Sequence, residues 1–143
     1  MFGSIKALDL RDAHSFGRVV VGWSGLFPLI FLLSSFAGLW LLAAHYYDLP
    51  VIFFAHFLYA VGGFAFMWKR VLLGRWLAGA GSIFALASTV AAISIIHMIA
   101  PLEDSKTATV LIRAALYLIH GLYFAGNVWI AVTIFKIPRP KAT

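Results

Sequence analysis

Four long apolar segments, separated by short polar stretches, dominate the pattern of hydrophobic and polar positions along this chain. They predict helices over about residues 19–45, 50–69, 76–99 and 108–136. Each segment meets the length of about 20 residues that a helix needs to cross the hydrocarbon core of a bilayer. We therefore expect an all-α integral membrane four-helix bundle, with residues 1–143 forming a single membrane domain.

The composition agrees with a membrane protein, because 63% of the residues are hydrophobic and only 11% are charged. Soluble domains carry about a quarter charged residues. Most of the basic residues lie before the first helix, between the second and third, or after the fourth: Lys6, Arg11, Arg18, Lys69, Arg70, Arg75, Lys136, Arg139 and Lys141. By the positive-inside rule both termini are cytoplasmic, and the net charge reports membrane topology and not nucleic-acid binding. The expected location is a bacterial inner (cytoplasmic) membrane.

Pro28 lies inside the first predicted helix, where it has no backbone N–H to offer the carbonyl of Ser24. The helix should kink there, and in membrane proteins neighbouring helices can satisfy the freed carbonyl. Trp23, Trp68 and Trp76 fall near predicted membrane interfaces, positions that are typical of an aromatic belt.

Small residues form a stripe along the third predicted helix, at Gly81, Ala85, Ser88 and Ala92. Such a stripe lets neighbouring helix backbones approach closely, so it predicts a packing helix. Between the second and third helices we expect a short cytoplasmic loop over about residues 71–75.

Two histidines occur in nearly the same local sequence, one in the second predicted helix and one in the fourth. The first segment is His56-Phe57-Leu58-Tyr59-Ala60-Val61-Gly62, and the second is His120-Gly121-Leu122-Tyr123-Phe124-Ala125-Gly126. Ionisable residues inside a membrane are functional candidates by default. At about 1.5 Å per residue, both histidines lie roughly 10 Å below the outer surface. Two imidazoles at equal depth can supply the axial ligands of a b-type haem.

The residues around these histidines suit a flat macrocycle. Tyr59 and Gly63 follow His56 at i+3 and i+7, and Tyr123 and Asn127 follow His120 at the same spacing, so each set shares a helix face. Glycine leaves room for a porphyrin, aromatic side chains can line its edge, and Arg113 is placed to pair with a haem propionate. The structural alternative is that the histidines form hydrogen bonds between helices and bind no cofactor.

Several short motifs resemble the four-helix cytochrome b membrane subunits of respiratory formate dehydrogenases and nickel–iron hydrogenases. The approach from Arg113 to His120 is similar to the family's arginine-to-histidine approach to a haem ligand, and His56 is similar to the other ligand of its outer haem. Arg11-Asp12-Ala13-His14 resembles the family's inner-haem motif, but Ser15 replaces its tryptophan. The family's second histidine on the fourth helix is also missing, near Ile134. The resemblance therefore implies one outer haem b, with quinone as a further candidate, and puts the inner haem in doubt.

These observations leave three hypotheses. The first is a haem-b membrane subunit of a respiratory or other electron-transfer complex, which passes electrons between a periplasm-facing redox subunit and quinone. The second is a cofactor-free structural subunit of a larger membrane assembly, and the third is a subunit that binds a chlorophyll-type pigment. The sequence has no cysteine, so thioether-attached haem and cysteine-ligated iron–sulfur clusters are excluded. A proton pump is disfavoured, because no Asp or Glu lies in a predicted span.

Overall fold

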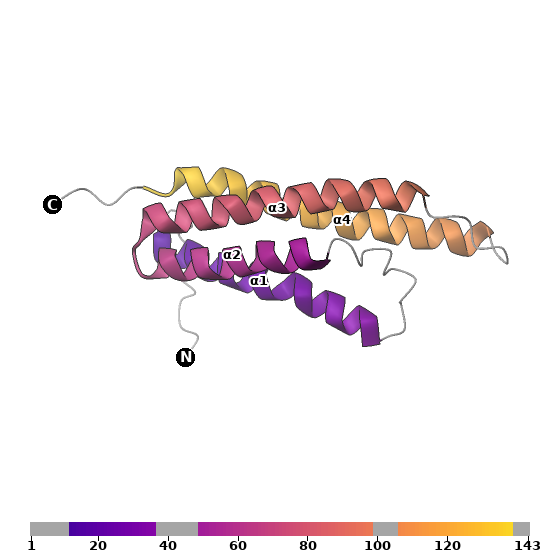
Figure 1. The fold of residues 1–143 in the computed structure, drawn as a ribbon, viewed down its shortest axis with the longest axis horizontal. Coiled ribbons are helices and arrows are strands. Elements are labelled where there is room, and N and C mark those ends of the chain that lie inside the picture. Colours follow the sequence, from indigo (N-terminus) through magenta and orange to yellow (C-terminus); the bar gives the residue numbers. More distant parts are fainter. Residues whose placement is uncertain (1–11, 37–48, 99–105, 139–143) are drawn as a thin grey trace, which may run out of the picture.

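Four helices, α1 to α4, run alternately up and down in the computed structural model, which describes residues 12–36, 49–98 and 106–138 (Figure 1). Their bounds are Ala13–Phe36 for α1, Leu49–Met67 for α2, Val71–Met98 for α3 and Lys106–Lys136 for α4. The all-helical prediction is confirmed. The start of α1, the α2–α3 connection and the end of α4 lie at one end of the bundle, which we call the basic end (Figure 1).

Three of the described helices are long and apolar enough to cross a membrane. The candidate spans are Pro50–Met67, Val71–Ser94 and Arg113–Lys136. The remaining predicted span is the first one, over residues 19–45, which extends past Phe36 and lies partly outside the described residues. The surface fits a lipid environment, because large apolar side chains such as Phe57, Leu118 and Phe135 are more than half exposed. Which side of a membrane holds the termini stays a prediction.

The close backbone approaches join α1 to α2, α2 to α3 and α3 to α4, and small residues permit the first two of them. A Cβ added to Gly63 would lie 2.9 Å from the Gly17 carbonyl oxygen, and a Cβ added to Gly81 would lie 2.9 Å from that of Ala55. The predicted packing stripe on α3 is confirmed, since Ala85, Ser88 and Ala92 are all buried. No equally extensive backbone contact joins α4 to α1 or α2 in the described part of the chain, so large side chains bridge those gaps.

The predicted loop over residues 71–75 is wrong, because α3 already begins at Val71. The turn is shorter: the Lys69 amide donates to the Phe66 carbonyl and the Arg70 amide to the Ala65 carbonyl. This pair of bonds is a Schellman motif, which requires a left-handed residue after the helix. Lys69 supplies it, with φ of 58°.

Helix α1 also begins earlier than predicted, at Ala13 rather than near residue 19. The carboxylate of Asp12 accepts a hydrogen bond from the Ser15 amide at 2.9 Å, which makes Asp12 the N-cap. That hydrogen bond lowers the pKa of Asp12 below its usual value. The cap explains why the helix extends into the polar segment.

Candidate functional site

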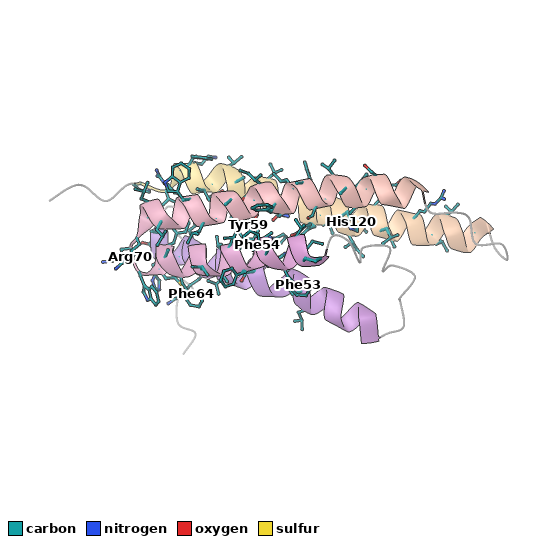
Figure 2. The ribbon with its side chains drawn as sticks, viewed as in Figure 1. Phe53, Phe54, Tyr59, Phe64, Arg70 and His120 are labelled. Atoms are coloured by element: carbon teal, nitrogen blue, oxygen red, sulfur yellow. The ribbon has the colours of Figure 1, made fainter. Side chains whose placement is uncertain are left out.

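A cluster of polar and aromatic side chains fills the centre of the bundle and draws on all four helices. We call it the buried polar cluster, and its members are Trp23, His56, Tyr59, Ser82, Tyr123 and Asn127. All except the half-buried Trp23 are at most 3% exposed. Figure 2 shows Tyr59 of α2 in the middle of the bundle and His120 of α4 farther from the basic end.

Pro28 explains the position of His56. Because proline has no N–H, the Ser24 carbonyl of α1 has no donor four residues later in its own helix. Nδ1 of His56 lies 2.9 Å from that carbonyl oxygen and must carry the proton, since a carbonyl only accepts. The expectation that a neighbouring helix satisfies the freed carbonyl is confirmed, and the neighbour is α2.

The protonated Nδ1 leaves the lone pair of His56 on Nε2 if the imidazole is neutral. That nitrogen lies 2.9 Å from the Tyr123 hydroxyl, which donates to it. The two rings stack with centroids 5.7 Å apart and an interplanar angle of 18°. Tyr123 also stacks on Trp23, with centroids 6.1 Å apart and planes within 9°. Tyr123 thus contacts both an α1 tryptophan and an α2 histidine.

The Asn127 side chain forms three further hydrogen bonds of the cluster. Its Oδ1 accepts from the Trp23 indole N–H at 3.2 Å and from the Tyr59 hydroxyl at 2.7 Å. The indole can only donate, which identifies the facing amide atom as oxygen. The Asn127 amide nitrogen donates to the Tyr123 carbonyl at 2.8 Å. The Ser82 hydroxyl lies 3.1 Å from that of Tyr59 and donates to the Ala78 carbonyl. One buried side chain of α4 therefore joins α1 and α2 to α4.

His120 lies one helical turn before Tyr123 and is 6% exposed. Its Nδ1 donates to the Leu116 carbonyl of its own helix at 2.8 Å. In the neutral imidazole, this bond leaves the lone pair on Nε2, as in His56. Both histidines thus have the tautomer that ligates metals through Nε2 and fixes the ring through Nδ1.

The structure separates the predicted site residues into two groups. His56, Tyr59, Tyr123 and Asn127 belong to the buried polar cluster, with His120 beside it. Gly63 does not: it lies at the α1–α2 crossing, where an added Cβ would be 2.7 Å from Val21 Cγ2.

Arg113 is half-buried on α4, two turns before His120. Ser82 was not predicted from the sequence. The prediction that Trp23 belongs to an interface belt is wrong, because its indole hydrogen-bonds inside the bundle. Trp68 and Trp76 are 74% and 73% exposed, as belt residues are.

His14, the resemblance's candidate for an inner ligand, has a different setting. Its Nδ1 lies 3.2 Å from the carbonyl of Met67, the last residue of α2. Terminal carbonyls of a helix lack intrahelical donors, so this contact caps α2. In the described part of the chain, no three His, Cys, Asp or Glu residues gather as a metal site.

The residues fit haem iron as a donor set, because His56 and His120 are buried and share the ligating tautomer. The surroundings of His56 add a condition. Its Nε2 accepts a hydrogen bond from the Tyr123 hydroxyl, so iron ligation would require that hydrogen bond to break. Comparison of the chain with protein-family models, curated proteins and solved structures gave no match.

Proposed function

We propose that the chain is a haem-b-binding membrane subunit of an electron-transfer complex, in which His56 and His120 would hold the haem iron. The observation that carries this proposal is the shared arrangement of the two imidazoles. Each is buried on a different helix, and each donates Nδ1–H to a backbone carbonyl. Bound haem would supply one-electron chemistry at its iron.

The protein's own contribution is to orient the two imidazoles and to keep water from them. The Ser24 and Leu116 carbonyls fix the rings, and close helix packing dries the interior. Tyr123 holds His56 Nε2 while no iron is bound. The apolar outer surface suits lateral contact with other membrane subunits, and we propose a periplasm-facing redox subunit as donor and quinone as acceptor.

A reduced-minus-oxidised absorption spectrum of the purified full chain tests the proposal. We expect a b-type α-band that is lost in His56→Ala and in His120→Ala. His14→Ala is the matched control, because His14 also faces a backbone carbonyl through Nδ1 but lies outside the cluster. A preparation without a b-type band, or a band unchanged in the first two variants, would refute it.

A cofactor-free structural subunit is the second candidate, and the closed hydrogen bonding of the buried polar cluster favours it. Tyr123→Phe separates the two functions, because it keeps the stacked ring and removes only the hydroxyl. If the chain binds haem, this variant takes up haem at least as well as the wild type, since His56 Nε2 loses a competitor. If the cluster serves packing alone, the variant stays colourless and unfolds more easily. A green pigment in the wild-type preparation would favour the third hypothesis.

A further inference from the structure

A groove of about 500 Å³ runs between α3 and α4 on the outer face of the bundle. Its floor is made of small residues, Gly79, Ala80 and Ala131, while Ile83 and Phe135 stand beside it and are 69% and 78% exposed. Small residues between large ones leave a channel that side chains do not fill. The volume falls within the range of about 300–1,000 Å³ that is usual for small-molecule sites.

The groove is long enough to hold an acyl chain of one bilayer leaflet. Along α3 its lining extends from Leu72 to Leu86, which is about 21 Å at 1.5 Å per residue. Half of a hydrocarbon core is about 15 Å thick. A single acyl chain of one leaflet therefore fits along it.

Positive charge stands at the end of the groove that lies toward the basic end. The Arg75 guanidinium lines the groove, donates to the Ile137 carbonyl and keeps a buried Nε without a hydrogen-bond partner in the described part of the chain. Lys69, Arg70 and Lys136 are exposed at the same end of the bundle, where Figure 2 shows Arg70 at the tip (Figure 2). Among the described residues, Asp12 is the one carboxylate, and it caps α1.

We propose that this groove binds one anionic phospholipid, with an acyl chain along the floor and the phosphate at Arg75. Basic pockets between membrane helices recognise such headgroups. The groove's single cation suits a single phosphate charge, and its other lining residues are almost entirely apolar. Besides Arg75, the polar side chains of the lining are Trp76 and Ser82. The Ser82 hydroxyl donates to the Ala78 carbonyl and is therefore not directed to a ligand.

Native mass spectrometry of the full chain in detergent tests this site, with phosphatidylglycerol and phosphatidylcholine of identical acyl chains as probes. We expect one retained phosphatidylglycerol. Arg75→Gln should weaken its retention about fivefold, the effect of one basic residue near a membrane surface, and should leave phosphatidylcholine little changed.

Gly79→Leu is the steric test, since a Cβ at Gly79 meets no atom within 4 Å and a leucine can extend into the groove without moving the backbone. It should reduce retention of both lipids. Gly22→Leu is the matched control, because Gly22 is equally open but lies on α1. Equal retention of the two lipids by the wild type, or unchanged phosphatidylglycerol retention in Gly79→Leu, would overturn the proposal.

Discussion

The bond between His56 and the Ser24 carbonyl should depend on Pro28, and a double-mutant cycle can measure this dependence. His56 lies where it does because Pro28 cannot donate to Ser24. Pro28→Ala restores an N–H at the right position in the helix. The carbonyl would then have a donor of its own, and the loss of His56 would matter less.

The expected coupling follows from the single hydrogen bond at stake. Interhelical hydrogen bonds in membrane proteins average about 0.6 kcal/mol and reach about 1.7 kcal/mol. We expect about 1 kcal/mol, because the Nδ1–O distance is a good 2.9 Å and the imidazole is 3% exposed. His56→Ala also opens a cavity and releases Tyr123, but these costs occur with either residue at position 28 and cancel in the cycle.

The assay is unfolding of the purified chain in mixed micelles for the wild type, His56→Ala, Pro28→Ala and the double variant. A second cycle with His14→Ala and Pro28→Ala serves as control, because His14 bonds the Met67 carbonyl instead. Distant sites add within about 0.3–0.5 kcal/mol. A His56–Pro28 coupling no larger than that would refute the inferred link between the proline and the histidine.

Three other predictions concern caps and the cluster. Lys69→Gly should stabilise the protein by about 1 kcal/mol in the same assay, because glycine adopts the left-handed conformation of Lys69 without cost. Lys69→Ala removes the same charge but should not stabilise the protein. Equal effects of the two substitutions would contradict the explanation. Asn127→Leu should destabilise by about 1–3 kcal/mol, because the Trp23 and Tyr59 donors lose their buried acceptor. A smaller cost than that of Thr133→Leu, at a half-buried site on the same helix, would argue against it. The Asp12 cap has a lowered pKa when folded, so its contribution is present above the unfolded pKa of about 4 and is lost as the pH falls through the folded value. Thermal unfolding in acid should therefore show a loss in the wild type that Asp12→Asn, which still caps but does not titrate, largely lacks.

The helices could be predicted from the sequence, because apolar runs of this length have few alternatives in a membrane. The ends could not, and each error has a local cause. Lys69 is in a conformation that usually calls for glycine, so nothing in the sequence marked the turn, and the predicted loop over residues 71–75 is helical. Trp23 was assigned to a belt because it falls near a predicted membrane interface, whereas the packing of α1 against α4 decides which way its indole points.

The site was predictable as a set of side chains but not as a set of bonds. Spacing on a helix identifies which residues share a face, and it grouped Tyr59 with His56 and Tyr123 with His120. The bonds run across helices instead: Tyr123 donates to His56, and Tyr59 donates to Asn127. Which partner lies opposite depends on the rotation and depth of each helix, and periodicity alone does not fix these.

The two similar segments are followed by different residues at the position seven residues after each histidine, and this difference affects how the helices pack. In α2 that position is Gly63, which lets the backbone of α1 approach at Gly17. In α4 it is Asn127, a large polar side chain that keeps α1 and α2 at a distance and accepts hydrogen bonds from both. Close packing on one side and side-chain bridging on the other bring Tyr123 to His56. Any cofactor that binds His56 through Nε2 must therefore compete with the Tyr123 hydroxyl, which makes that hydroxyl the most informative group to remove.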